Sequence, residues 1–135
     1  MREILFRGKR IDNGKWVEGE MLHDMQDRAW IYWKTPKELP VVFSRNATVE
    51  PETVGQFTGL TDKNGKRIFE GDIVHCVSMA DMANMVVIFE DGEFRMVLCE
   101  KYKDYIHGCG FYAIRCFDKE IIGNIHDNPE LLKEE

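Results

Sequence analysis

Short runs of β-branched, aromatic and alternating side chains recur along the chain, and glycine, asparagine, aspartate and proline separate them. Runs of this composition with a two-residue period are typical of antiparallel strands joined by turns. Strands are therefore expected over residues 4–7, 15–21, 29–33, 40–43, 53–57, 72–77, 85–89, 93–99, 110–117 and 120–125. The pattern predicts a mainly β protein.

Turn-forming residues mark the places where one expected strand meets the next. The pairs Asn13-Gly14 and Asp91-Gly92 adopt positive φ easily, and the second joins two expected strands directly, which predicts a tight hairpin. The segment Asp62–Gly65 matches part of a calcium-binding loop, but Leu60 and Gly71 stand where that loop needs carboxylates. This segment is therefore expected to be a turn.

The order of elements in the second half of the chain favours a barrel. The pair Gly71-Asp72 leads into an apolar strand that a hairpin follows, as is common in small SH3-like barrels. The expected fold is a barrel-like single domain over residues 1–135. The segments 13–20 and 64–72 resemble each other faintly, which suggests two related β halves of about 1–60 and 61–135.

Helix is expected at three places only. Residues 51–53 are able to form one turn, and residues 78–84 are able to form two. The segment Asn128–Lys133 has a good N-cap residue and proline at its first helical position, so it predicts a short C-terminal helix. Met79, Met82 and Met85 are spaced three apart and form one stripe if their segment is helical, either as a lid over the core or as an adaptable interface.

The segment Trp30–Lys34 places large rings on both faces of an expected strand. If one face packs against the core, the other presents aromatic side chains that suit protein contacts or base stacking. The alternative is a strand buried on both faces. The candidate partner surface consists of Trp30, Tyr32, Trp33, Met79 and Met82.

Composition limits the class of protein. The chain has 135 residues, 44% of them hydrophobic and 31% charged, which is a composition of one folded domain and not of a disordered chain. No run reaches the roughly 18 apolar residues that a membrane span needs. The first seven residues lack the pattern of a secretory signal, so the protein is expected in the cytoplasm without a membrane partner.

Net charge disfavours nucleic acid as the partner. Lys and Arg number 18 and Asp and Glu number 24, which gives 18 − 24 = −6, and phosphate repels such a chain. Single-stranded nucleic acid stays the alternative to a protein partner, since aromatic side chains stack on bases. That platform would consist of Trp30, Tyr32, Trp33, Lys101, Tyr102 and Lys103.

No arrangement of reactive residues predicts catalysis, a metal or a cofactor. The four cysteines, at positions 76, 99, 109 and 116, form no C-x-x-C pair, and the nearest approach to a metal-binding spacing is His107 with Cys109 beside His75-Cys76. Buried thiols in the core are the favoured interpretation. The carboxylates beside the glycine-rich turns are expected to be solvated, so the chain is not expected to be an enzyme.

Three blocks of the chain carry a family resemblance. The central block covers Gln56–Lys66 and Ile68–Val74, the C-terminal block covers Ile122–His126 and Asn128–Leu132, and the N-terminal block consists of Arg2-Glu3-Ile4, Phe6-Arg7 and Lys15-Trp16-Val17. Together they resemble the YopX family of small phage and prophage proteins. The departures are mild: Gly8-Lys9 replaces an Ala-Trp pair, and Phe57, Phe69 and His126 stand where tyrosine is frequent. Residues 75–118 carry no matching signature.

The resemblance implies an all-β, barrel-like protein that is able to self-associate, and it brings no catalytic residues. The expected function is that of a non-enzymatic phage or prophage accessory protein that binds a protein partner or forms a homo-oligomer. The aromatic side chains near residues 30–33 would be part of that contact.

Overall fold

The computed structural model describes residues 3–34, 44–77, 82–99, 102 and 118–132. The expected strands over 40–43 and 110–117 lie outside them. Ten strands and two short 3-10 helices follow one another along the described residues. They are β1 (Phe6–Lys9), β2 (Trp16–His23), β3 (Ala29–Lys34), β4 (Ser44–Val49), η1 (Pro51–Thr53), β5 (Gly55–Thr61), β6 (Arg67–Phe69), β7 (Asp72–Val77), β8 (Met82–Glu90), β9 (Glu93–Leu98), β10 (Asp118–Asn124) and η3 (Pro129–Leu132).

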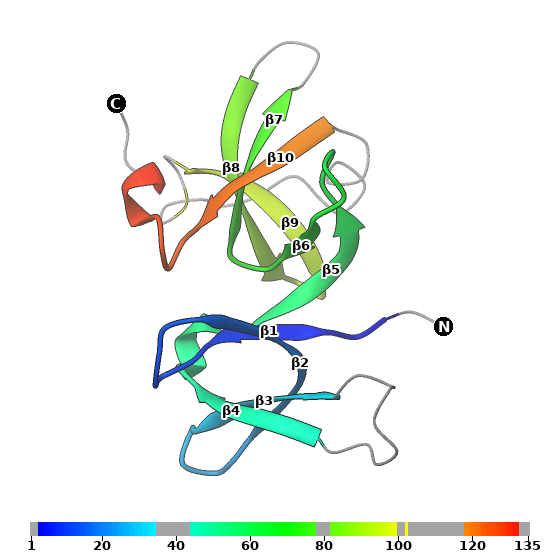
Figure 1. Cartoon of the computed structure of the whole chain (residues 1–135). Coiled ribbons are helices and arrows are strands. Elements are labelled where there is room, and N and C mark those ends of the chain that lie inside the picture. The colour runs from blue at the N-terminus through cyan, green and yellow to red at the C-terminus, as the bar shows by residue number, and fades with distance from the viewer. Residues whose placement is uncertain (1–2, 35–43, 78–81, 100–101, 103–117, 133–135) are drawn as a thin grey trace. The chain divides into compact units, whose positions relative to one another are not determined.

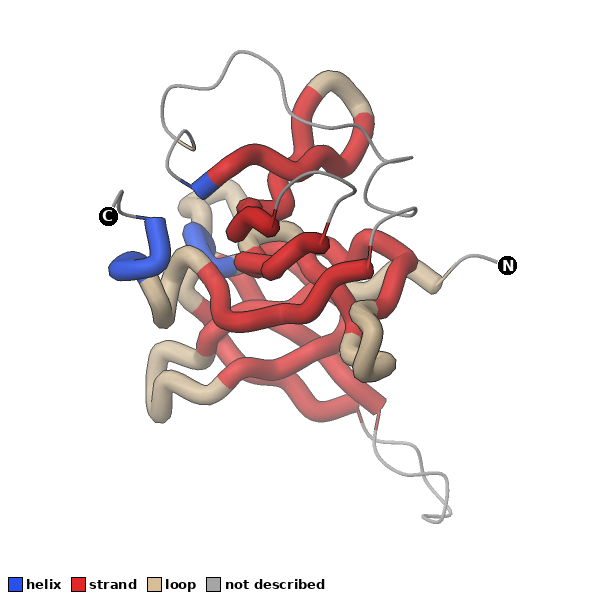
Figure 2. Tube along the Cα trace, turned by 90° about the horizontal axis from the view of Figure 1, so that it is seen from above, coloured by secondary structure: helices blue, strands red, loops and turns tan. Residues whose placement is uncertain are grey.

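The prediction of a mainly β protein is confirmed, and Figure 2 shows helix only in short pieces among the strands. The hairpin at Asp91-Gly92 is also confirmed, because Glu90 pairs with Glu93 and the two turn residues have φ of 53° and 80°. Two strands were not expected. In β4 only Ala47 and Val49 are apolar, and β6 has only three residues.

The chain divides into two compact units, Met1–Phe57 and Thr58–Glu135, with the boundary inside β5. A family relation between two halves stays a prediction, although both of the similar segments contain a glycine turn, at Gly14 (φ 69°) and Gly65 (φ 82°). The next glycines differ, because Gly19 lies within the β2 ladder whereas Gly71 has a φ of 93° in a turn.

Unit 1 is built around a strand that pairs with two neighbours in turn. The first half of β2, up to Gly19, pairs with β1, and its second half, from Glu20, pairs with β3. The strands follow the order β4-β3-β2-β1-β5, all antiparallel where they pair (Figure 1). The inward side chains Ala29, Ile31 and Val49 form the core of this unit.

Unit 2 contains a four-stranded antiparallel sheet, in the order β10-β7-β8-β9, that is apolar on both faces. Consecutive residues such as Ile73 and Val74 enter different core clusters, because neighbouring side chains on a strand point to opposite faces. The first cluster contains Ile68, Val74, Cys76, Val87 and Met96, and the second contains Ile73, Val86, Ile88, Val97 and Cys99. Burial on both faces explains the unbroken apolar runs of this half.

The expected barrel does not close. In unit 1 the outer strand β4 meets the end of β1 at a single bridge, Arg10 with Val49, where a closed barrel needs a continuous ladder. The contact is completed by hydrogen bonds from the N–H of Ile11 to the carbonyl of Thr48 (3.1 Å) and from the N–H of Glu50 to the carbonyl of Lys9 (2.9 Å). The described residues therefore form antiparallel sheets without a closed barrel.

The expected C-terminal helix is not supported. Residues Pro129–Leu132 form one 3-10 turn, with the N–H of Leu131 bonded to the carbonyl of Asn128, three residues back (3.1 Å). Leu131 and Leu132 pack against the second core cluster of unit 2, and this contact with the core holds the segment. No helix among the described residues is long and apolar enough to cross a bilayer.

The helix expected over residues 78–84 is wrong where the structure describes it, because Met82–Glu90 is strand β8, paired with β7 along its first half. The methionine stripe required a helix, since a spacing of three places residues on one side of a helix but not of a strand. Met79 lies outside the described residues.

Candidate binding surface

Strand β3 separates its aromatic side chains between two faces. Ala29 and Ile31 are buried at 3% and 0% exposure, and Trp33 packs against their cluster. Trp30 and Tyr32 alternate with them, so they lie on the opposite face of the strand and are half-buried. Of the aromatic residues expected at a partner surface, the structure places these two on one face and Trp33 on the other.

The strands beside β3 extend the face that holds Trp30 and Tyr32. Trp30 stands between Leu22 of β2 and Thr48 of β4 in the ladders. Leu22 is 53% exposed, so it adds apolar surface beside Trp30. We call this surface of unit 1 the outer face; its residues are Glu20, Leu22, Trp30, Tyr32, Asn46 and Thr48.

The turn from β2 to β3 is held by one carboxylate. Asp24 accepts hydrogen bonds from the backbone N–H groups of Gln26 and Arg28, each at 2.9 Å, and from the Arg28 Nε at 2.7 Å. The backbone N–H and the guanidinium of Arg28 hold the pKa of the Asp24 carboxyl below its ordinary value. The guanidinium also lies over the Trp30 ring, 5.7 Å from its centroid. The turn therefore positions a cation beside the outer face.

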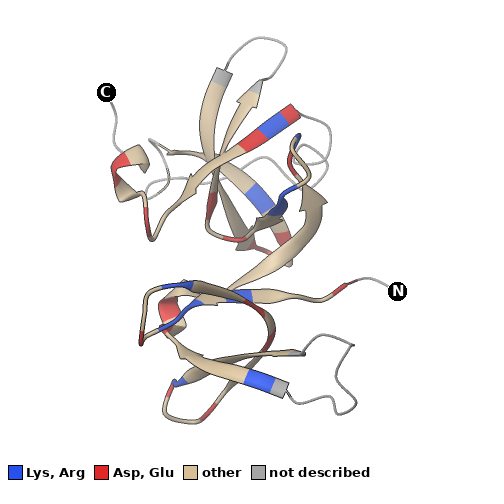
Figure 3. Cartoon of the chain, in the orientation of Figure 1, with Lys and Arg blue, Asp and Glu red and all other residues tan. Residues whose placement is uncertain are grey.

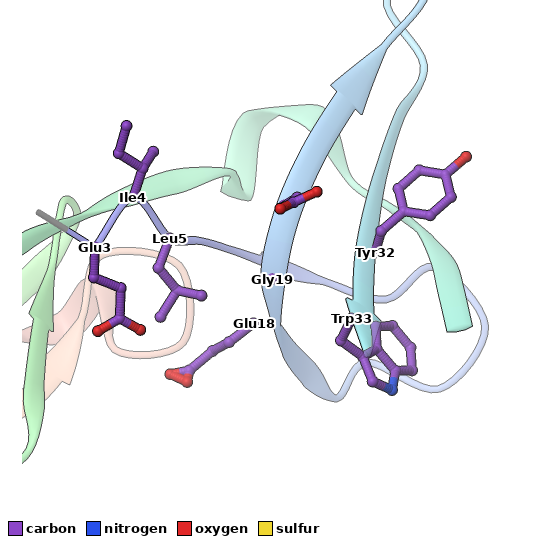
Figure 4. A pocket seen from close by; sticks show the side chains of 8 residues that line it. Glu3, Ile4, Leu5, Glu18, Gly19, Tyr32 and Trp33 are labelled. Carbon is purple, nitrogen blue, oxygen red and sulfur yellow. The ribbon is translucent and has the colours of Figure 1, made fainter. Parts of the chain in front are cut away.

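A pocket of about 380 Å³ lies in unit 1, next to the outer face. It is lined by Glu3, Ile4, Leu5, Glu18, Gly19, Glu20, Tyr32 and Trp33. Figure 4 shows the side chains of Glu3, Leu5 and Glu18 directed to the same side, with Ile4 directed the opposite way. The pocket therefore combines carboxylates with apolar and aromatic residues.

Gly19 is required where β2 passes from β1 to β3. A Cβ atom at this position would lie 1.8 Å from the carbonyl oxygen of Tyr32 and 2.7 Å from its carbonyl carbon. Only a residue without a side chain allows the two backbones to approach this closely. Gly19 therefore sets the position of Tyr32 relative to the pocket and the outer face.

The central segment of the family resemblance has a structural role at Asp62. This carboxylate is 6% exposed and accepts hydrogen bonds from the N–H groups of Asn64 and Lys66 (2.9 Å each) and of Ile121 in β10 (3.0 Å). Burial raises the pKa of the Asp62 carboxyl, but these backbone N–H groups outweigh it and hold the pKa below its ordinary value. The Asp62–Lys66 turn is thereby tied to β10.

The second aspartate of that segment is also part of a turn. Asp72 is 1% exposed, and its carboxylate accepts a hydrogen bond from the N–H of Phe69 at 2.7 Å. Gly71, between them, donates its N–H to the carbonyl of Val87 and accepts at its own carbonyl from the N–H of Ile125. β7 therefore begins at the Gly71-Asp72 pair. The backbone hydrogen bonds of Gly71 connect this point to β8 and to the residue that follows β10.

The remaining candidates contribute little to a site. Lys101 and Lys103 lie outside the described residues, and Tyr102 packs against the second core cluster of unit 2. Met82 belongs to β8. Among the residues that the structure describes, no three His, Cys, Asp or Glu side chains are grouped as a metal ion would need.

The two described thiols are buried, as expected for core cysteines. Cys76 lies 3.8 Å from the sulfur of Met96 in the first core cluster, and Cys99 lies in the second. The sheet of unit 2 separates the clusters, so these two thiols are not placed to form a disulfide with each other. His107, Cys109 and Cys116 lie outside the described residues.

Comparison with known proteins places the chain in a family. The structure is similar to the crystal structure of protein EF1440 from Enterococcus faecalis, with a TM-score of 0.59 and 25% sequence identity over 98% of this chain and 100% of that one. No curated protein matches the chain. The model of the family described as YopX protein matches residues 5–133, nearly the whole chain, so the resemblance is confirmed and the chain belongs to the YopX family.

Proposed function

We propose that this chain is a non-enzymatic accessory protein of phage or prophage origin that binds a protein partner in the cytoplasm through the outer face of unit 1. The proposal is carried by one observation: Trp30, Tyr32 and the exposed Leu22 lie next to one another on one face of a sheet whose other face is the core. Tyrosine and tryptophan are enriched in protein interfaces, where they contribute large contact areas at low cost in conformational entropy.

Asp62 and Asp72, in the central segment of the family resemblance, support a role without catalysis. Asp62 and Asp72 are acidic groups taken out of solvent, which is a feature of catalytic carboxylates. Both accept backbone hydrogen bonds within turns, and the pKa of Asp62 is lowered, not raised toward neutrality. The Asp62 carboxylate, held by these backbone N–H groups, stabilises its turn and stays ionised at neutral pH.

Self-association through the same face is the second form of this proposal. Aromatic and aliphatic side chains on an open sheet face are able to contact a second copy of the chain as well as a different protein. Light scattering on the purified chain separates the two forms. A concentration-dependent dimer that Trp30→Ala abolishes supports self-association, and a monomer at every concentration leaves a different protein as the partner.

Affinity capture from phage-infected or prophage-induced cells tests the proposal. The immobilised chain is compared with Trp30→Ala, Tyr32→Ala and the control Glu52→Gln, which changes an exposed residue of η1. We expect one protein to be retained by the parent and by the control and to be lost with both outer-face variants. The purified partner is then titrated against each variant, with an expected affinity loss of at least about tenfold for Trp30→Ala.

One result would contradict the proposal, and a control excludes unfolding as the cause of a lost partner. Equal retention of the partner by Trp30→Ala and the parent would show that the outer face is not the interface. Loss of the partner together with a lowered melting temperature of Trp30→Ala would point to unfolding, so the melting temperature of each variant is measured first. Trp33→Ala serves as the comparison for misfolding, because Trp33 packs against the core cluster of unit 1.

A further inference from the structure

Two turns of the chain contain the same three residues, Asn-Gly-Lys, at positions 13–15 and 64–66. An asparagine amide reacts with the backbone most easily when glycine follows it, because glycine has no side chain that obstructs its own nitrogen. Both asparagines are exposed, and the two glycines have φ of 69° and 82°. Each glycine also donates its N–H to a backbone carbonyl at 3.0 Å. The two sites are therefore matched in sequence, exposure and the hydrogen bond of the glycine.

The side chain of Asn13 is folded over the peptide bond that follows it. Its Oδ1 accepts a hydrogen bond from the N–H of Lys15 at 2.9 Å. This bond closes a ring that contains both the Cγ of Asn13 and the nitrogen of Gly14. The same N–H stabilises negative charge on Oδ1, where charge develops when a nucleophile adds to Cγ. The turn therefore positions the amide for attack by the Gly14 nitrogen and makes it more electrophilic.

The corresponding groups of the second turn have other partners. The N–H of Lys66 donates to the Asp62 carboxylate at 2.9 Å, not to the side chain of Asn64. The Nδ2 of Asn64 donates to the Oε1 of Glu120 in β10 at 3.3 Å. The amide of Asn64 is therefore held toward another strand, although its sequence is the same as that around Asn13.

Asn124 is the opposite case. Its Oδ1 accepts a hydrogen bond from the N–H of His126 at 2.9 Å, which closes the same ring as at Asn13. The residue that follows is Ile125, whose branched side chain crowds its own nitrogen. Asn64 has the glycine without the folded amide, and Asn124 has the folded amide without the glycine. Of these three asparagines, Asn13 combines both.

We propose that Asn13 is a site of spontaneous deamidation in the folded protein. The nitrogen of Gly14 forms a bond to the Cγ of Asn13, the bond from Cγ to Nδ2 breaks, and the amide leaves as ammonia with the proton that the glycine nitrogen loses. The product is a five-membered cyclic imide, and water opens it at either of two C–N bonds. One opening gives aspartate, and the other gives isoaspartate, in which the main chain runs through the former side chain.

The isoaspartate product changes a turn on which unit 1 depends. Arg10 donates its N–H to the carbonyl of Lys15 at 2.9 Å, and the same residue forms the bridge to Val49 of β4. Isoaspartate at position 13 adds one carbon to the main chain between Arg10 and Lys15, so both contacts lose their geometry. We therefore expect the isoaspartate form to unfold at a lower temperature than the unmodified chain.

The test incubates the full chain at pH 7.4 and 37 °C and follows deamidation at each asparagine by peptide mass spectrometry. The repeated Asn-Gly-Lys sequence makes Asn64 an internal control. We expect Asn13 to react at least about tenfold faster than Asn64 in the folded chain. In guanidinium chloride, where the turns are lost, the two rates are expected to agree within about twofold. Equal rates in the folded chain, or the same ratio under both conditions, would overturn the proposal.

Two variants locate the cause. Lys15→Pro removes the N–H that bonds to the Oδ1 of Asn13 and is expected to slow deamidation there at least about tenfold. Asn64→Ser is the control and is expected to leave the rate at Asn13 unchanged. An unchanged rate in Lys15→Pro, with a melting temperature equal to that of the parent, would overturn the role of this hydrogen bond. If Lys15→Pro does not fold, the ratio of the two rates in the parent decides.

The structural consequence is tested on the separated product. The isoaspartate form is purified by ion exchange and compared with Asn13→Asp, which has the same charge and an unaltered main chain. A lower melting temperature of the isoaspartate form is expected, and equal melting temperatures would contradict the effect on the turn. None of these measurements involves a partner, so their outcome is independent of the proposed function.

Discussion

Gly19 occupies the point at which β2 leaves β1 and begins to pair with β3. Its φ does not lie in the left-handed region, so the reason for glycine here is space and not backbone conformation. Backbone atoms of Tyr32 occupy the place of a side chain, and a strand backbone that is bonded to two neighbours has little freedom to move away. One missing Cβ therefore determines how closely β2 and β3 pack beside the pocket.

We expect Gly19→Ala to lower the free energy of unfolding by roughly 3 kcal/mol or more, because the added methyl group overlaps a backbone carbonyl. Urea denaturation followed by tryptophan fluorescence measures the loss. Gly14→Ala is the matched control in the same unit, since its Cβ would lie at an ordinary 3.7 Å from Lys9 and only its φ of 69° is unfavourable. That control is expected to cost about 1 kcal/mol. Equal losses in the two variants would show that the close approach to Tyr32 is not the cause.

Asp62 shows how a single carboxylate connects distant parts of unit 2. Replacing it by asparagine keeps its size but turns an amide N–H group toward one of the three backbone donors. We expect Asp62→Asn to lose about 2 kcal/mol of unfolding free energy at pH 7. Asp118→Asn, which removes an exposed carboxylate from β10, serves as the control and is expected to change stability by less than about 0.5 kcal/mol.

The contribution of Asp62 also depends on pH in one direction. Its pKa is lower in the folded chain than its ordinary value, so the folded state favours the ionised carboxylate. The resulting stability is fully present above the unfolded pKa of about 4 and is lost as the pH falls through the folded pKa. The stability difference between the parent and Asp62→Asn should therefore shrink when denaturation curves are repeated at progressively lower pH below about 4. A difference that grows in this range would contradict the assignment.

At the scale of the elements, the sheet of unit 2 differs from that of unit 1 in having two apolar faces. Ile68 of β6 belongs to one face's cluster, and Leu131 and Leu132 pack on the other. The short η3 segment therefore matters more for packing than its length indicates, because its leucines cover part of the sheet that would otherwise be exposed.

Truncations on the two faces should cost the same order of free energy. Ile73 and Met96 are both 0% exposed and lie in different clusters. We expect Ile73→Ala and Met96→Ala each to destabilise the protein by about 2–5 kcal/mol, as measured by urea denaturation. Ile122→Ala, at 38% exposure, is the control and should cost less than about 1 kcal/mol. A small loss of unfolding free energy at only one of the two buried positions would mean that its face of the sheet is not fully covered by packed side chains.

At the scale of the whole molecule, charge favours a protein over a nucleic acid as the proposed partner. Lys and Arg are scattered among Asp and Glu in both units and form no continuous basic band on the described residues (Figure 3). The pocket beside the outer face adds three glutamates. A nucleic-acid strand that stacked on Trp30 and Tyr32 would bring phosphates close to these carboxylates.

We therefore expect no saturable binding of a fluorescein-labelled single-stranded 20-mer at 50 mM salt, as measured by fluorescence anisotropy. Binding that falls steeply with salt and that Trp30→Ala removes would establish the nucleic-acid alternative instead. Binding to a protein partner is expected to weaken less steeply with salt, because the outer face contributes apolar contacts that ions do not screen.

Local signals in the sequence were sufficient for several elements. The extent of β7 matches its prediction residue for residue, because a continuous apolar run begins directly after the Gly71-Asp72 turn. The hairpin at Asp91-Gly92 was predictable, since only a few residue pairs accept two successive positive φ values. β4 was missed because its buried residues, Ala47 and Val49, are separated by polar ones and are preceded by polar residues.

The aromatic surface was only partly predictable from the sequence. Alternation along β3 implied that its rings divide between two faces, but which face is the core depends on the strands that pair with β3. The pocket was not predictable, because residues 3–5, 18–20 and 32–33 meet only through strand pairing. Three glutamates spread over 18 positions, from Glu3 to Glu20, carry no motif.

The amino-acid order by itself determined the β class, the hairpin turn at Asp91-Gly92 and the burial of Cys76 within an apolar strand, because each depends on the period and the chemistry of a few neighbouring residues. Tertiary structure alone decided that the sheets stay open, that Asp62 and Asp72 stabilise turns, and that Trp33 faces the core while Trp30 and Tyr32 do not. These outcomes depend on register between strands, and a shift of one residue exchanges the two faces of a strand.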